Sequence, residues 1–290
     1  MGSGKRFAVL LCAEDSDYVK KKYGGYFGVF LRMLAEEGEA WDVFRVSSGE
    51  FPGDGEIGGY DGFVITGSCS DAHSNDLWIC KLLNLLKKLD SMKKKVLGVC
   101  FGHQGLRLEE ILKVLKTSHL NSFCLQSHSL FFPCMVFHEL FEINQSNEMR
   151  ILSRALGGKT GRSITGWDIG VRTVHLSQSS KLFASLKMPK LLSIIECHQD
   201  EVRELPPKAE VIAWSNKTGI EMFRYGDHMM GIQGHPEYTK DILLHLTDRL
   251  LNCNLILGSF ADEVRANVEA SEPDMEAWKK LCISFLKGGL

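Results

Sequence analysis

The stretch KVLGVCFGHQ, residues 95–104, indicates the fold class of this chain. Its first half is almost uninterrupted apolar sequence, which is typical of a strand buried on both faces of a parallel sheet. The run delivers Cys100 at its end, with Gly98 and Gly102 two residues to either side. Ligands of open α/β sheets bind outside the carboxyl ends of the strands. We therefore expect an α/β fold with a functional cysteine at the edge of its sheet.

Apolar runs alternate with amphipathic segments along the chain, which predicts a mostly parallel sheet flanked by helices. The expected strands lie at about residues 7–11, 41–46, 62–67, 96–99, 171–174, 191–195, 211–214 and 229–233. The expected helices lie at about residues 26–37, 76–95, 240–251 and 259–287. In the second helix the inward set is predicted to be Leu77, Leu82, Leu83, Leu86 and Leu89. With no internal repeat or low-complexity linker, a single domain over residues 1–290 is the simplest organisation.

The composition excludes several classes of partner. Hydrophobic residues make up 44% of the chain and charged residues 24%, an ordinary globular balance. A net charge of −2 offers no basic field to nucleic acid, and no apolar run reaches the roughly 18 residues that cross a membrane. The nine cysteines form no Cys-x-x-Cys pair, which argues against a zinc site. Their odd number and the lack of a secretory signal predict reduced thiols and a cytosolic location.

The Gly-x-Cys-x-Gly pattern around Cys100 is the thiol version of the Gly-x-Ser-x-Gly nucleophile elbow. The chain must reverse sharply there, and the flanking glycines keep neighbouring backbone clear of the sulfur. A thiol at the start of the next helix gains from the helix dipole, which favours the thiolate. The amide of Phe101 points to the same spot and can stabilise an oxyanion. By itself, the pattern is equally compatible with a merely buried cysteine.

His235-Pro236-Glu237 supplies the candidate base. Residues two apart in an extended segment point the same way, and Pro236 biases His235 towards an extended conformation. Glu237 can therefore orient the imidazole and complete a set of nucleophile, base and orienting carboxylate. Without the cysteine turn, this tripeptide would more often be an ordinary turn.

The two motifs VCFGHQ, residues 99–104, and QGHPE, residues 233–237, together resemble the signature of the class I glutamine amidotransferases. Residues 23–26, 60–68 and 197–202 look like the plant γ-glutamyl peptidases, cytosolic members of that class that cleave the γ-glutamyl bond of glutathione and its conjugates. The resemblance covers nearly the whole chain except one block. It implies a flavodoxin-like α/β fold and hydrolysis of a γ-glutamyl bond through a thioester. We expect no cofactor, no metal and no obligatory protein partner.

Carried over residue by residue, the resemblance implies Cys100 as nucleophile, His235 as base and acid, and Glu237 as orienting carboxylate. The backbone amides of Ser68 and Phe101 would form the oxyanion hole.

The γ-glutamyl pocket implied by the resemblance would be lined by Gln104, His198, Gln199 and Asp200. Simpler interpretations stay open for two of these residues. His198 is also compatible with a hydrogen-bonded histidine at a strand end, and Asp200 with a solvated loop charge.

Residues 105–150 interrupt the resemblance. Family members continue from the elbow into a helix that ends in Ala-x-Gly-Gly, and that continuation appears here only at residues 151–158. After Gly105 the block has no glycine, one proline, five phenylalanines and three histidines. Its bias towards Phe, Leu, Ser and Cys is typical of pyrimidine-rich, non-coding sequence when it is translated. Our hypothesis is that this non-family insertion is a retained intron or a gene-model error. Residues 106–116 have helical spacing, and they either replace the split helix or compete with residues 151–156 for its place.

Two other functions stay open. One is a glutaminase that supplies ammonia to a separate synthetase, since the chain has no Gly-x-x-x-x-Gly-Lys nucleotide loop of its own. The other is an inactive or misfolded variant, because the insertion splits the helix that follows the nucleophile. A preference for glutamine would indicate the first, and a lack of selective labelling at Cys100 would indicate the second.

Overall fold

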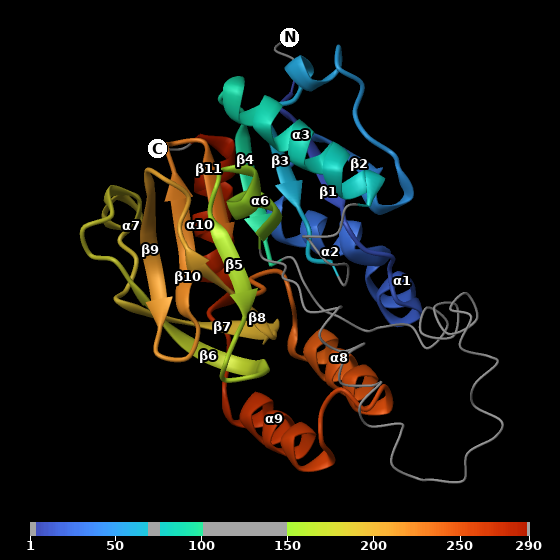
Figure 1. Ribbon diagram of the computed structural model, residues 1–290, viewed down its shortest axis with the longest axis vertical. Helices are drawn as coiled ribbons and strands as arrows, with labels where there is room; N and C mark the ends of the chain where they lie inside the picture. The colour runs from blue at the N-terminus through green and yellow to red at the C-terminus, as the bar shows by residue number, and fades with distance from the viewer. Residues whose placement is uncertain (1–3, 69–75, 101–149, 289–290) are drawn as a thin grey trace, which may run out of the picture.

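The computed structural model describes residues 4–68, 76–100 and 150–288. A nine-stranded sheet runs through the molecule in the order β2-β1-β3-β4-β11-β10-β9-β6-β7 (Figure 1). The first five strands of this order are parallel neighbours: β2 (Ala40–Arg45), β1 (Arg6–Leu11), β3 (Gly62–Ile65), β4 (Lys95–Val99) and β11 (Met229–Ile232). The pairings that follow are antiparallel and involve β10 (Gly219–Tyr225), β9 (Ala209–Ser215), β6 (Asp168–Leu176) and β7 (Leu191–His198). A separate two-stranded sheet joins β5 (Lys159–Arg162) to β8 (Asp200–Glu204).

The inner parallel strands are apolar because helices cover both of their faces. Every residue of β3 and β11 is buried, and so are the last five residues of β1, whereas the edge strand β2 is only partly buried. The antiparallel half is less uniformly apolar, and β9 leaves Val211 and Trp214 partly exposed. The predicted α/β class is confirmed.

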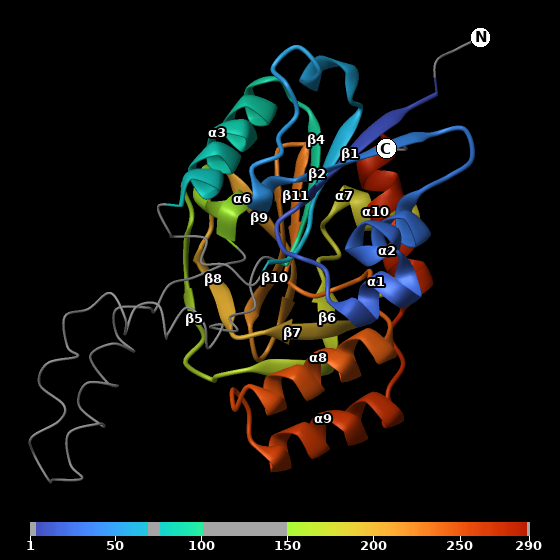
Figure 2. The same ribbon diagram turned by 90° about the vertical axis from the view of Figure 1, so that its right-hand side faces the viewer.

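Helices lie in layers on the two faces of the parallel strands (Figure 2). One layer contains α3 (Leu77–Ser91) and α6 (Arg150–Ala155), and the opposite layer contains α1 (Asp17–Tyr23), α2 (Gly25–Leu34) and α10 (Met275–Lys287). Two more helices, α8 (Lys240–Asn252) and α9 (Gly258–Ala270), lie side by side against β7 and β6. The segment predicted as helix at residues 259–287 is therefore two helices. Short elements complete the described chain: α7 (Lys181–Leu186) and the 3₁₀ helices Val46–Ser48 and Ile57–Gly59.

Helix α3 buries a stripe at helical spacing, as predicted, with one correction. Leu82, Leu86 and Leu89 are fully buried, but Leu77 is 71% exposed. At 100° per residue, Leu77 lies well away from the stripe that these leucines form, so its inward assignment was wrong. No helix among the described residues is long and apolar enough to cross a membrane.

The two predicted motifs lie at the carboxyl ends of the neighbouring strands β4 and β11. They are parallel neighbours, and Val99 at the end of β4 pairs with Ile232 at the end of β11. The chain that follows each strand therefore emerges at the same carboxyl edge, although more than a hundred residues separate the two in sequence. The predicted positions Phe101 and Gln104, and the helix expected at residues 106–116, lie outside the described residues.

Candidate active site

Cys100 directly follows β4 and has a strained backbone. Its φ is 21°, on the left-handed side of backbone space that residues with a side chain rarely adopt. Its backbone N–H donates a hydrogen bond of 2.9 Å to the carbonyl oxygen of Ile232. The hydrogen-bond ladder between β4 and β11 therefore extends to the Cys100 backbone. The strain predicted at the nucleophile is present, whereas the residues that would complete the predicted turn lie outside the described part of the chain.

Helix α6 packs behind this turn. The first carbon of a side chain at Gly98 would lie 3.2 Å from Leu152 Cδ2, so the glycine allows the close approach of the helix to β4. Ile151 and Leu152 border a small hollow together with Val99 and Cys100. The residues that follow the insertion therefore form a helix, and this helix lies against the strand that carries the cysteine.

His235 and Glu237 are paired as predicted, but by a different backbone route. His235 Nδ1 lies 2.9 Å from Glu237 Oε1, and both side chains are buried. The segment is a turn, closed by a 3.3 Å hydrogen bond from the Tyr238 N–H to the His235 carbonyl, rather than the extended tripeptide expected from the sequence. A carboxylate only accepts hydrogen bonds, so Nδ1 carries the proton and Nε2 is left as the basic nitrogen.

Cys100 and His235 line one cavity, with an empty volume of about 580 Å³ that includes its open mouth. Gly67, two residues past the end of β3, lies between them. The first carbon of a side chain there would be 3.2 Å from the Cys100 carbonyl oxygen and 3.3 Å from His235 Cε1. The predicted convergence of these two residues at the carboxyl edge of the sheet is present in the structure.

Two further contacts hold the walls of this cavity. Tyr238 stacks on the His235 ring, with 3.9 Å between ring centroids and an interplanar angle of 8°. Ser68, expected to act only through its backbone, has its hydroxyl bound to the Cys12 carbonyl oxygen at 2.6 Å. The Ser68 side chain is thus used in packing the loop after β3.

The predicted pocket residues at the end of β7 and the start of β8 have other surroundings. His198 Nδ1 lies 2.8 Å from the backbone oxygen of Asp200, and the Asp200 carboxylate lies 3.4 Å from Arg162 Nε. Neither these two residues nor Gln199 is among the described residues that line the cavity, whereas Cys197 is. Alternate residues of a strand face opposite ways, so a wall formed by Cys197 turns His198 aside. Binding of substrate by His198, Gln199 and Asp200 stays a prediction.

Burial suppresses the reactivity of two other cysteines. It raises the pKa of the Cys197 thiol to about 12. Burial also raises the pKa of Cys282 well above its usual range. Thiols are nucleophilic as thiolates, so both are inert at neutral pH. Both cysteines act as small buried apolar residues.

Comparisons with known proteins agree with this geometry. The sequence profile of the glutamine amidotransferase class-I family matches residues 148–243. Two Arabidopsis thaliana proteins, γ-glutamyl peptidase 5 and γ-glutamyl peptidase 3, are 44% and 42% identical to this chain over 98% of its length, and 96% and 97% of their own chains are covered. The chain belongs to the class I glutamine amidotransferase family, among the γ-glutamyl peptidases. A glutamine amidotransferase from Thermotoga maritima shares the fold, with a TM-score of 0.63 at 17% identity over 99% of this chain and 98% of its own.

Sequence reasoning missed several residues of this amidotransferase-like site. Tyr238 follows the His-Pro-Glu motif directly, and a turn assignment for that motif would have placed its ring over His235. The acidic residues Glu196 and Glu221 went unnoticed, although each interrupts an otherwise apolar strand segment, LLSIIECH in β7 and GIEMF in β10. A charged residue within an apolar strand segment is the signal that could have identified both glutamates, because carboxyl groups are rarely buried without a partner.

Proposed function

We propose that this chain is a cysteine-dependent hydrolase that cleaves the γ-glutamyl bond of glutathione or its conjugates. The observation that carries the proposal is the placement of Cys100 and His235 around one cavity, with His235 oriented by Glu237. The names of the relatives give the reaction class, since proteins up to 44% identical over almost the full chain are γ-glutamyl peptidases. The substrate is therefore a small γ-glutamyl peptide.

In the proposed reaction, the Cys100 thiolate attacks the γ-glutamyl carbonyl carbon. The protonated His235 Nε2 donates to the departing amine as the carbon–nitrogen bond breaks, which leaves a γ-glutamyl thioester on Cys100. Water then attacks the thioester, His235 takes its proton, and glutamate leaves as the thiol re-forms. Glu237 stabilises the imidazolium in both steps through its bond to Nδ1.

The oxyanion of each tetrahedral intermediate would be held by the backbone amides of Ser68 and Phe101. The position of Ser68 supports its half of this proposal, because the residue lines the same cavity as Cys100. Its hydroxyl is held by the Cys12 carbonyl oxygen, which fixes the loop that presents the Ser68 amide.

A glutaminase is the alternative within the same family. The Thermotoga relative of the fold is named a glutamine amidotransferase, and the same thioester would form from glutamine with release of ammonia. Initial rates with a glutathione conjugate and with glutamine, measured on one preparation, separate the two functions. Our proposal predicts the higher kcat/KM for the conjugate, and a higher value for glutamine would overturn it.

We further propose one domain over residues 1–290 with a non-family insertion at residues 105–150. The family profile supports this boundary, because its match begins at residue 148. The insertion joins the nucleophile turn to α6, so it lies next to the reactive centre in sequence. An inactive or misfolded product is the third candidate, and it predicts no turnover of either substrate.

The remaining expectations are proposals about the setting of the enzyme. We propose a cytosolic location, since the buried Cys197 and Cys282 form no disulfide, and reducing compartments keep thiols in this state. We also propose that catalysis needs no other protein, since the candidate nucleophile, base and orienting carboxylate all come from one chain. Fractionation of cells and activity of the isolated chain test these two points.

A further inference from the structure

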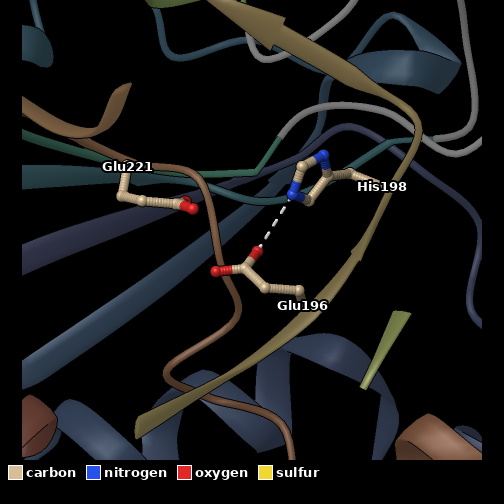
Figure 3. A group of neighbouring side chains, drawn as sticks. All are labelled: Glu196, His198 and Glu221. Carbon is tan, nitrogen blue, oxygen red and sulfur yellow. Dashed lines mark ion pairs between the residues drawn. The ribbon is translucent and has the colours of Figure 1, made fainter. Parts of the chain in front are cut away.

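A cluster of titratable side chains is buried beside the base and takes no part in the proposed reaction. Glu196 and His198 belong to β7 and Glu221 to β10, and their side chains point towards one another (Figure 3). Their exposed fractions are 0%, 2% and 2%. Ionisable groups at this depth carry a large desolvation cost, so their arrangement needs an explanation.

The cluster adjoins the segment that carries the base, Gln233–His235, from both sides. The Gln233 N–H donates to the Glu221 carbonyl oxygen at 2.7 Å, and the His235 N–H donates to the Ile195 carbonyl oxygen at 2.7 Å. Between these anchors, the first carbon of a side chain at Gly234 would lie 2.5 Å from Glu196 Oε1. The Glu196 carboxyl therefore packs directly on the backbone of the residue before the base.

The protons of the cluster can be assigned from its contacts. The backbone oxygen of Asp200 only accepts, so His198 Nδ1 carries a hydrogen, and His198 Nε2 faces Glu196 Oε2 at 3.1 Å. Burial raises the pKa of Glu196 and of Glu221 well above the usual range, and the neighbouring Glu196 carboxyl adds to the shift of Glu221. Burial therefore favours the neutral form of both carboxyls.

The charged neighbour of the cluster, Asp168, is paired with cations. Asp168, which pairs with His198 across β6 and β7, is bound by Arg172 Nε at 2.7 Å and approached by Lys217 Nζ at 3.2 Å. The three side chains of the cluster offer ligand atoms that lie within 4.8 Å of one another, so the experiment below also measures bound metal.

We propose that Glu196, His198 and Glu221 form a support cluster that fixes the backbone of Gln233–His235, and that Glu196 is a positioning residue for His235. The proposal rests on the proposed function, in which His235 is the base. The cluster holds the segment at Gly234 by packing, and strands β7 and β10 hold it on either side by hydrogen bonds. Loss of the Glu196 side chain frees the backbone next to the base without removing any reacting group.

The test uses the full chain and the variants Glu196→Ala, Glu196→Gln, Gly234→Ala and Glu196→Ala/Gly234→Ala, with exposed Glu210→Ala as control. Two readouts are taken on folded protein: kcat and KM for a glutathione conjugate, and the pH profile of Cys100 alkylation by iodoacetamide, which reports formation of the thiolate that the proposed mechanism places beside His235. Glu196→Ala is expected to lower kcat about 10- to 100-fold with little change in KM, and to shift the alkylation profile. Glu196→Gln, a neutral donor of the same shape, should recover most of that loss.

Gly234→Ala tests the contact itself. Gly234→Ala should lower kcat in the parent chain, where the added methyl group meets the Glu196 carboxyl. In the Glu196→Ala background that carboxyl is absent, so Gly234→Ala should lower kcat only slightly further. The two effects on kcat are therefore expected not to be additive. Additive losses, or a folded Glu196→Ala variant with unchanged kcat and alkylation profile, would overturn the proposal. The proposal would also be overturned if mass spectrometry found one bound metal ion per chain in the parent protein and none in the Glu221→Gln variant.

These outcomes are separable from failure of the proposed function. If the parent chain cleaves no γ-glutamyl bond, the function is wrong, and the alkylation profiles still decide whether Glu196 positions His235. If Glu196→Ala does not fold, Gly234→Ala must by itself shift the alkylation profile, and an unshifted profile would refute the proposal.

Discussion

At the scale of single residues, the site depends on one hydrogen bond between two buried side chains. Glu237 Oε1 fixes Nδ1 of His235 as a donor and leaves Nε2 as the basic nitrogen of a ring that lines the same cavity as Cys100. The stacked Tyr238 ring limits the other motion of the imidazole, its rotation out of plane. The His235 ring is therefore oriented by two contacts: the Glu237 carboxylate at its edge and the Tyr238 ring on its face.

Replacing Glu237 by Gln keeps the shape and removes the charge that stabilises the imidazolium. We expect kcat for γ-glutamyl hydrolysis to fall about 10²- to 10⁴-fold while the fold is retained, by comparison with other triads of this type. Steady-state kinetics and thermal melting check both parts. Glu263→Gln, an exposed change on α9, is the control and should be neutral. Equal kcat values for the two variants would remove Glu237 from the mechanism.

At the scale of elements, α6 is the helix that backs the nucleophile turn. Leu152 is buried against Gly98, so Leu152→Ala leaves a cavity directly behind β4. We expect a loss of about 2–5 kcal/mol in the free energy of unfolding. Urea denaturation measures it, and Ile164→Ala, at a site 93% exposed, should change stability by less than about 0.5 kcal/mol. A neutral Leu152→Ala would mean that α6 does not pack where the structure has it.

Helices α1 and α8 are joined by Asp241, and this contact predicts a pH dependence. Burial alone would raise the pKa of Asp241, but hydrogen bonds from Thr239, Tyr18, Lys22 and Tyr23 outweigh it and lower the pKa. A depressed pKa means that the ionised form stabilises the fold above the ordinary carboxyl pKa of about 3.9, and that this contribution is lost as pH falls through the folded-state pKa.

Asp241→Asn should therefore lower the melting temperature by a few degrees at pH 7, about 1 kcal/mol for a partly exposed group. The difference from the parent chain should shrink as pH falls below about 4. Melting curves between pH 3 and pH 8 measure it, with exposed Asp262→Asn as reference. A difference that stays constant over this range would show that the charge of Asp241 is not what stabilises the contact.

Local pattern predicted the elements that meet at the site, but not all of their contacts. Cys100 was identified because an apolar strand, a flanking glycine pair and a following turn are readable within five residues. The neighbours Cys197, Tyr238 and Glu196 could not be assigned in this way, since their roles depend on how β7, β10 and β11 lie side by side. Leu77 shows the same limit on a helix, where one residue outside the stripe was assigned to it.

At the scale of the whole molecule, we propose that the insertion at residues 105–150 lowers the activity of this chain. All residues of helix α6 except Arg150 follow the block, and α6 lies against the strand that carries Cys100. We expect the chain that lacks this block to be more soluble and to hydrolyse γ-glutamyl substrates at least 10-fold faster per molecule. Expression yield, the monodisperse fraction and kcat of the two chains, compared side by side, are the measurements.

A separate observation decides the origin of the block. If it is a retained intron, transcripts sequenced across this junction should mostly lack it, and peptides from residues 105–150 should be absent from the natural protein. A dominant message with the block, together with its peptides, would contradict that hypothesis. Equal activity of the two chains would show that the insertion is harmless, whatever its origin.

The central claim is that Cys100 forms a γ-glutamyl thioester, and the most direct measurement is to trap that intermediate. The chain is mixed with a glutathione conjugate, quenched in acid within the first turnovers and mapped by peptide mass spectrometry, with Cys100→Ser as control. We predict a γ-glutamyl adduct on the Cys100 peptide alone, and none in the variant. An adduct on another cysteine, or hydrolysis by Cys100→Ser at the rate of the parent chain, would contradict this account.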